Sequence, residues 1–274
     1  MKIFVIVLIC AFITHLGYTQ SVNTLMGARQ AGLGYASVIL TDDWSVHNNP
    51  AGISSLKQSS VGFAYDLTPG IAGGNRVAAS LNAPAKWFNS GVGFFRFGDA
   101  LYSESRISIA VGNKIGISSL SLRGNYNQYR ADGFGTSTAF SLDVGSITQL
   151  TQQISVGLYI TNITQTSFTS SSGERLPTRL VAGFGYTPSE KILITTEIEK
   201  DLDFPIMWRT GFEMGIYNNV FFRTGYNLNP NAGFFGLGFK KKNLKIDYAL
   251  RYQHSLGVSH QASASYILPE IKKK

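Results

Sequence analysis

The sequence has one cysteine, Cys10, and only 15% of its 274 residues are charged. Cys10 lies in an N-terminal apolar run without a lipobox-like context, so we expect neither a disulfide nor a lipid anchor. No stretch after residue 20 stays apolar for the roughly 18 residues of a membrane-spanning helix, which excludes a helical membrane protein. Amphipathic helical periodicity is nearly absent as well, although a soluble enzyme of this length would normally show several such helices.

The N-terminus has the pattern of a secretory signal peptide. Lys2 supplies a positive charge, residues 3–13 form an unbroken apolar run, and Gly17 and Thr19 are small residues before a cleavage site. A buried N-terminal strand or helix would not explain this order of features. We therefore expect residues 1–19 to be removed by cleavage before Gln20, which leaves a mature chain without cysteine.

Glycine and aromatic residues are abundant, with 29 Gly, 18 Phe and 13 Tyr. The mean hydropathy of +0.04 arises from alternating apolar and polar residues and not from long apolar segments. Such a composition is typical of a β-barrel with lipid outside and water inside. Much of the net charge of +8 lies in two short basic runs, residues 240–242 and 272–274. Because no nucleic-acid-binding motif accompanies them, we expect no nucleic-acid partner.

From residue 60 onward the sequence shows fourteen segments in which apolar and polar residues alternate. Successive side chains of a strand point to opposite faces, so each segment predicts a strand with one apolar and one polar face. In one of them, Leu244 and Ile246 share a face, whereas Lys245 and Asp247 share the other. The segments lie near residues 60–66, 76–83, 90–97, 105–115, 118–129, 136–146, 154–163, 179–186, 191–200, 206–216, 219–226, 233–240, 244–252 and 258–268.

The predicted fold is all-β, a transmembrane antiparallel β-barrel of about 14 strands over residues 58–268. A soluble β-sandwich would also alternate, but here the apolar faces are rich in aromatic residues near the strand ends, where membrane barrels have their girdles. The connections alternate in length, with DLTPGIAGGN, GDALYSES and residues 164–177 on one side and IG, YNN and KKN on the other. Long extracellular loops and short periplasmic turns indicate the cell outer membrane, with a basic periplasmic tail at residues 269–274.

Residues 20–57 lack this alternation, and we expect them to form a short helical plug segment. Thr41 or Asp42 would cap a helix that runs through Trp44. The Asn49–Pro50 pair would end that helix, because the residue before a proline avoids the helical region. The residues assigned to the plug are Asp42, Asp43, Trp44, Asn49 and Pro50.

The polar faces of neighbouring expected strands carry charges of both signs. Charges shielded from water need partners, because an unpaired buried charge costs several kcal/mol. We favour an ion-pair lattice that fills and stiffens the barrel over a polar conduit, since the N-terminal segment plugs the lumen. A channel for hydrophobic solutes would prefer an apolar pocket, and few inward apolar residues are found beyond Leu193 and Phe221. The expected lumen network is Arg106, Arg123, Glu197, Arg209, Glu213, Arg223, Lys245, Asp247 and Arg251, together with Asp143 and Glu199.

No catalytic or metal-binding constellation stands out. His47, His254 and His260 are scattered, and no His or Cys pair has metal-ligand spacing; His47 is expected to be a packing or capping residue. We therefore expect no catalytic site, no cofactor and no metal, and a protein that is not an enzyme. Gly-x-Gly pairs occur at residues 91–93, 183–185 and 236–238. Inside strands these glycines relieve crowding or allow a bend and do not form phosphate loops.

Near the N-terminus the chain carries the pattern G-A-R-x-x-G-x-G, followed by D-D-x-S and N-P-A-G. The residues are Gly27, Ala28, Arg29, Gly32, Gly34, Asp42, Asp43, Ser45, Asn49, Pro50, Ala51 and Gly52. This pattern resembles the entry of the FadL-like outer-membrane barrels. Near the C-terminus the pattern G-x-G-F-K-x-K-x-x-x-I-D-Y-A precedes L-G, H and S-x-S-Y. Its residues are Gly236, Gly238, Phe239, Lys240, Lys242, Ile246, Asp247, Tyr248, Ala249, Leu256, Gly257, His260, Ser263, Ser265 and Tyr266. This end resembles more specifically the PorV/PorQ branch, found in Bacteroidota.

The resemblance implies a fourteen-stranded barrel and two kinds of function. FadL-like barrels pass hydrophobic solutes across the outer membrane. PorV/PorQ-like barrels bind partner proteins of the type IX secretion system, and some receive its secreted cargo. We favour a partner-binding or assembly component of type IX secretion, surrounded by outer-membrane lipid and bound to one or more protein partners. The alternatives are a FadL-like channel for a hydrophobic ligand and a structural barrel partner of another envelope complex.

Overall fold

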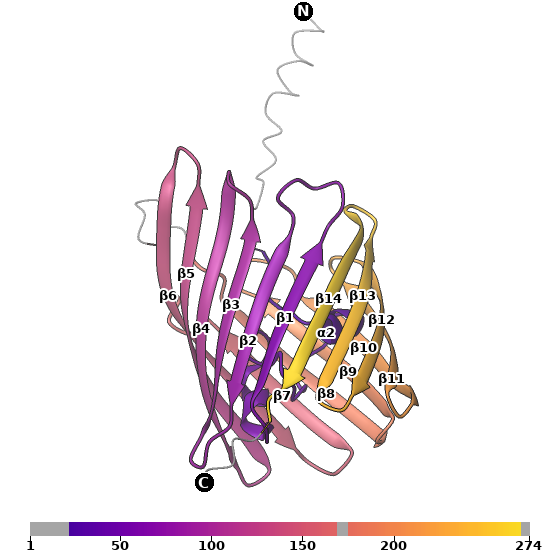
Figure 1. Ribbon diagram of the computed structural model, residues 1–274. Coiled ribbons are helices and arrows are strands. Elements are labelled where there is room, and N and C mark those ends of the chain that lie inside the picture. Colours follow the sequence, from indigo (N-terminus) through magenta and orange to yellow (C-terminus); the bar gives the residue numbers. More distant parts are fainter. Residues whose placement is uncertain (1–21, 169–174, 270–274) are drawn as a thin grey trace, which may run out of the picture.

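A closed antiparallel barrel of fourteen strands makes up most of the chain in the computed structural model (Figure 1). The structure describes residues 22–168 and 175–269, so the expected signal peptide and nearly all of the expected tail lie outside the described residues. Each strand pairs with its neighbours in sequence, and β1 pairs with β14 to close the ring. The fold class and the strand count predicted from the alternation are confirmed.

The strands follow the predicted segments closely, with several extended by one to three residues. They are β1 (Ser60–Leu67), β2 (Arg76–Ala83), β3 (Asn89–Gly98), β4 (Tyr102–Ile115), β5 (Ser118–Ala131), β6 (Gly135–Gln149), β7 (Ile154–Thr161), β8 (Arg179–Ser189), β9 (Ile192–Asp201), β10 (Met207–Tyr217), β11 (Val220–Leu228), β12 (Ala232–Lys241), β13 (Leu244–Gln253) and β14 (Gly257–Ile267).

The apolar face of each strand points outward and the polar face points into the lumen. On β10, Trp208 and Ile216 are exposed, whereas Arg209 and Glu213 are buried. The exposed Tyr217 ends the same strand, so aromatic side chains stand at both of its ends. An outward apolar band with aromatic residues at its edges suits a wall that faces lipid.

The two rims of the barrel differ. Turns of two residues join β4 to β5 and β12 to β13 at one rim, while residues 68–75 and 162–178 form the longest connections at the other. Strands β4, β5 and β6 rise highest at this second rim (Figure 1). The loop expected at GDALYSES is shorter than predicted and comprises residues 99–101, because β3 runs to Gly98 and β4 begins at Tyr102. Residues 103–105 pair with residues 96–98 of β3, and their polar sequence Ser-Glu-Ser shows no apolar alternation that a sequence pattern could detect.

Two short helices precede the barrel, α2 (Ala28–Gly32) and the 3-10 helix η1 (Pro50–Ser55). The helix expected from Asp42 through Trp44 is not formed, since residues 43–47 make successive turns instead. Asn49–Pro50 begins η1 and does not end a helix, because the Asn49 side chain accepts the N–H of Ala51 and Pro50 needs no partner at the first position. Among the described residues, no helix has the length and apolar character required to cross a membrane.

Candidate functional site: the plugged lumen

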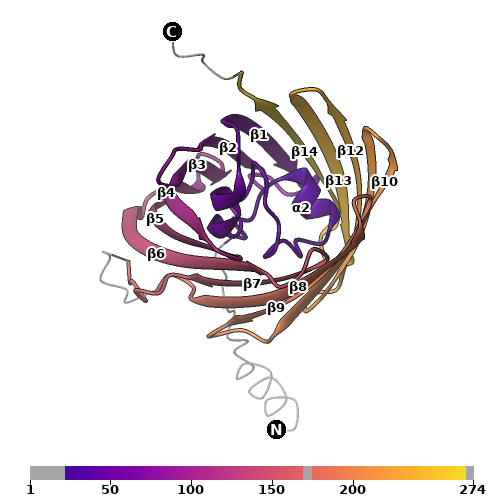
Figure 2. The same ribbon diagram turned by 90° about the horizontal axis from the view of Figure 1, so that it is seen from below.

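Residues 22–57, called the plug from here on, lie inside the barrel (Figure 2). Helix α2 packs against β11 to β14, and η1 packs against β3 to β6. Between these helices, Leu33 and Val38 pack against Tyr159 and Val181 of β7 and β8. Trp44 packs against the small and aromatic residues of β1 to β3. The plug therefore contacts the wall around the whole lumen.

Glycines of the wall let the plug backbone come close. A Cβ at Gly225 of β11 would overlap the backbone nitrogen of Gly34, and a Cβ at Gly183 of β8 would overlap the side chain of Val38. Gly183 belongs to one of the Gly-x-Gly pairs for which the sequence predicted relief of crowding. The crowding comes from the plug and not from neighbouring strands alone.

Asp42 holds the centre of the plug together. Its Oδ1 accepts the backbone N–H of Trp44 at 3.0 Å, and its two oxygens accept the Gln30 amide at 2.9 and 2.7 Å. Its Oδ2 also accepts Nη1 of Arg29 at 3.0 Å. Asp42 therefore closes a local turn with Trp44, and residues 43–47 continue as successive turns. The prediction that Asp42 caps a helix here was wrong.

Arg29 links the plug to the wall. Its Nε and Nη2 donate to Glu213 of β10 at 2.9 and 2.7 Å. Burial alone would lower the pKa of Arg29, but the carboxylates of Glu213 and Asp42 raise it above its usual value. Glu213 also accepts Nε of Arg223 at 2.5 Å, and Nη1 of Arg223 donates to Asp247 at 2.7 Å. Five charged groups thus form one continuous chain from the plug to β13.

Glu197 of β9 anchors the next part of the plug. Its Oε2 accepts the backbone N–H groups of Ser37 and Val38, both at 2.8 Å. Arg209 donates to Glu197 at 2.7 Å and to Glu199 at 2.6 Å. This arrangement gives one buried carboxylate both a cation and two plug donors, which is what a buried charge requires.

Arg123 of β5 performs the corresponding role on the opposite side. Its Nη2 donates to Asp143 at 2.6 Å, and its Nη1 donates to the carbonyls of Val46 and Asn48 at 2.6 and 3.2 Å. The hydroxyl of Tyr159 contacts the same guanidinium. Arg123 is 1% exposed, so it holds the plug through bonds from which water is excluded.

Two members of the expected network form no ion pair within the described part of the chain. Arg106 donates to Asn127 at 2.7 Å and to Thr24 at 2.8 Å, and Arg251 donates to Ser259 at 2.9 Å. The neighbouring strands present amides and hydroxyls at these positions in place of carboxylates. For Arg106 and Arg251 the expected ion pairs are therefore replaced by hydrogen bonds from the guanidinium to neutral acceptors.

The sequence reasoning also missed members of the network. Arg29 was part of the N-terminal pattern but was not assigned to the lumen. Arg76 pairs with Asp66 at 2.5 Å, and Arg179 pairs with Asp201 at 3.0 Å. Asp66 and Arg76 flank the first long loop and face each other in the β1–β2 register. Their opposite charges on either side of a predicted hairpin loop were the sequence signal for this pair.

His47 is a buried member of the plug whose Nε2 lies 2.9 Å from the carbonyl oxygen of Ala79. Burial lowers the pKa of His47 to about 4, the Ala79 carbonyl partly opposes this, and the cations Arg123 and Arg106 lower it further. His47 is thus neutral at neutral pH. Over residues 22–168 and 175–269, no group of three or more His, Cys, Asp or Glu residues is arranged to hold a metal ion.

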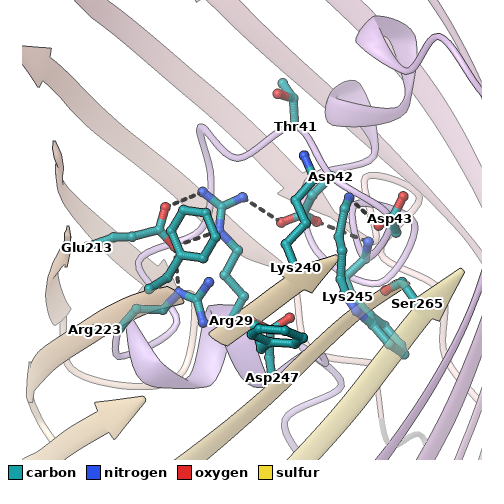
Figure 3. Close-up of a pocket in the computed structure, with 13 residues that line it drawn as sticks. Arg29, Thr41, Asp42, Asp43, Glu213, Arg223, Lys240, Lys245, Asp247 and Ser265 are labelled. Atoms are coloured by element: carbon teal, nitrogen blue, oxygen red, sulfur yellow. Dashed lines mark hydrogen bonds and ion pairs between the residues drawn. The ribbon is translucent and has the colours of Figure 1, made fainter. Parts of the chain in front are cut away.

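A cavity of about 190 Å³ lies between the plug and the wall, near the short-turn rim (Figure 3). Lys245 of β13 donates to Asp43 of the plug at 2.7 Å within it. Charged groups and aromatic rings share the lining, so the cavity is amphipathic. It is lined by Arg29, Thr41, Asp42, Asp43, Trp44, Glu213, Phe221, Arg223, Phe239, Lys240, Lys245, Asp247 and Ser265.

Known proteins resemble this chain in structure but not detectably in sequence. No protein-family profile matches it, and no curated protein matches its sequence. The CymD monoaromatic hydrocarbon channel is similar over 91% of this chain and 100% of its own, with a TM-score of 0.70 and 13% identity. The Ralstonia pickettii toluene transporter TbuX is similar over 90% of this chain and 99% of its own, with a TM-score of 0.67 and 12% identity. A Pseudomonas aeruginosa FadL homologue is similar over 91% and 99%, with a TM-score of 0.57 and 10% identity.

These likenesses show a shared fold. Together with the closed ring of strands and the outward apolar band, they define the class of this protein as an outer-membrane β-barrel with an internal plug.

Proposed function

We propose that the protein is an outer-membrane channel for small hydrophobic molecules, gated by its plug. The observation that carries the proposal is the cavity of about 190 Å³ between plug and wall, which the rings of Trp44 and Phe221 help to line. Two proteins with this fold are described as a monoaromatic hydrocarbon channel and a toluene transporter. A single aromatic ring suits a cavity of this size, whereas a drug-sized ligand needs roughly 300 Å³ or more.

The way the plug is held supports a gating role. The plug meets the wall through ion pairs and hydrogen bonds to Glu197, Arg123 and Glu213, and these groups can exchange protein partners for water. The apolar contact is divided into four small clusters and not gathered in one core. Part of the plug can therefore move while the ring of strands stays closed.

Uptake of radiolabelled toluene by whole cells tests the channel, with the plug locked by an engineered disulfide. A Cβ at Gly183 would overlap Cγ1 of Val38, so Val38→Cys with Gly183→Cys brings two thiols together, and residues 22–274 hold no other cysteine. We expect uptake above that of vector cells, a loss in the locked variant and recovery after reduction. The single variant Val38→Cys is the control. Uptake no faster than that of vector cells would contradict the proposal.

Type IX secretion is the second candidate, and the closed lumen favours it. The chain of charges from Asp42 to Asp247 fills space that an open conduit would need, and a barrel that does not conduct can still bind partner proteins. The C-terminal residue pattern from Gly236 to Tyr266, which resembles PorV/PorQ-like barrels, supports the same proposal. A simpler version of this candidate is a barrel that serves only as the structural partner of another envelope complex.

Gene deletion and pull-down from mild detergent separate the two candidates. Loss of surface delivery of type IX cargo, with secretion components in the pull-down, would support the second candidate. Normal delivery together with slower toluene uptake in the deletion strain would support the channel.

A further inference from the structure

Two lysines face each other at the short-turn end of the cavity. Lys240 of β12 and Lys245 of β13 are directly paired in the strand register, and both line the cavity. Figure 3 shows their side chains running side by side toward the plug segment with Asp42 and Asp43. Lys245 is neutralised by Asp43 at 2.7 Å, but Lys240 has no ion-pair partner in the part of the chain that the structure describes.

The nearby carboxylates are already engaged. Asp42 accepts from Arg29 and Gln30, Glu213 accepts from Arg29 and Arg223, and Asp247 accepts from Arg223. Like charges directly opposite each other on neighbouring strands are destabilising. Asp43 already offsets the charge of Lys245, so an anion placed between the two lysines would give Lys240 a partner without displacing any existing pair.

The remaining wall of the cavity fits a flat apolar group. Phe221, whose ring centroid lies 5.7 Å from the Arg223 guanidinium, lines the cavity together with Trp44. Aromatic rings prefer offset or edge contacts with other rings, which such a lining offers. The volume of about 190 Å³ has room for one ring with a short substituent and not for a long acyl chain.

We infer that this cavity binds a small aromatic carboxylate, with its ring beside Phe221 and its carboxylate between Lys240 and Lys245. The inference rests on the channel function proposed above, for which it names the class of solute. The carboxylate would sit at the short-turn rim, so the site would be the last that a solute meets before it leaves the lumen on that side.

Calorimetric titration of the full-length barrel in detergent with benzoate tests the site. Lys240→Gln removes the unpaired cation without breaking an ion pair, and we expect it to weaken benzoate binding about tenfold. Lys241→Gln is the matched control, because it removes the same charge one residue along the strand, on the other face. We expect its affinity for benzoate to equal that of the wild type. Equal weakening by both variants would show general attraction to the basic turn and would overturn the inference.

Two further probes examine the two halves of the ligand. Toluene, which lacks the carboxylate, should bind wild type and Lys240→Gln equally. Inorganic phosphate should fail to displace benzoate at equal concentration, and displacement would overturn the aromatic part of the inference. Toluene uptake without benzoate binding would overturn the inference and leave the channel standing. Benzoate binding without toluene uptake would support the site and contradict the channel.

Discussion

The guanidinium of Arg29 in the plug grips the carboxylate of Glu213 on β10 with two parallel bonds, Nη2 to Oε1 at 2.7 Å and Nε to Oε2 at 2.9 Å. A bidentate pair of this kind fixes orientation as well as distance. The same guanidinium also pairs with Asp42, so the Arg29 side chain connects helix α2 and the turn at Asp42 to the wall.

Arg29→Met should loosen the plug while the barrel stays folded. The change leaves Glu213 and Asp42 with fewer partners, and breaking a buried pair in this way costs about 3–5 kcal/mol. We expect a lower unfolding temperature in detergent and faster proteolysis between residues 22 and 57. Lys114→Met, at an exposed position of β4, is the control and should leave both measurements unchanged.

Arg123 and Asp143 should prove strongly coupled. Arg123→Met leaves the buried Asp143 carboxylate without its cation and the carbonyls of Val46 and Asn48 without a donor. It should therefore destabilise the barrel by about 3–5 kcal/mol in urea titration. Asp143→Leu alone should be similarly harmful, while the double variant should cost less than the sum of the two. Simple additivity would show that the pair contributes no interaction energy.

On the outward faces of β12 and β13, the cost of a charged side chain should depend on its depth in the membrane. Leu237 is 46% exposed near the middle of its strand, and Leu244 is 38% exposed beside the turn. A mid-bilayer arginine costs about 2–4 kcal/mol and one near the interface about 0–1 kcal/mol. Leu237→Arg should therefore lower the yield of folded barrel in lipid vesicles far more than Leu244→Arg. Equal yields would mean that no membrane surrounds this face.

His47 should make plug stability depend on pH. Its pKa is about 4 in the folded chain against 6.5 in the unfolded one, so the unfolded state binds more protons between these values. Stability should be fully present above pH 6.5 and should decline as the pH falls toward 4, by at most about 1.4 kcal/mol per unit. The difference between wild type and His47→Gln in unfolding titrations isolates this contribution from that of the carboxylates. A difference that does not change with pH would contradict the assignment of a buried neutral imidazole.

The alternation of side chains was sufficient to predict the barrel. Which face a strand residue occupies depends only on its parity, a local property that the sequence displays directly. The segments around Trp208 and Leu244 were therefore placed correctly, together with the inward direction of Arg209 and Asp247. Where both faces are polar, as in residues 103–105 of GDALYSES, the alternation disappears, and the first residues of β4 were not predicted.

The partners inside the lumen were decided by tertiary structure alone. Arg29 and Glu213 are 184 residues apart, and no local pattern states that they meet. Arg106 faces inward as predicted but meets Asn127 and Thr24, because the neighbouring strand and the plug offer no carboxylate there. Asp42 looked like a helix cap, yet Arg29 and Gln30 occupy its carboxylate. The sequence by itself determined the number of strands and the face of each residue, since both follow from local geometry. Only the closed ring around the plug decided which charges pair, because that depends on distances between segments far apart in the chain.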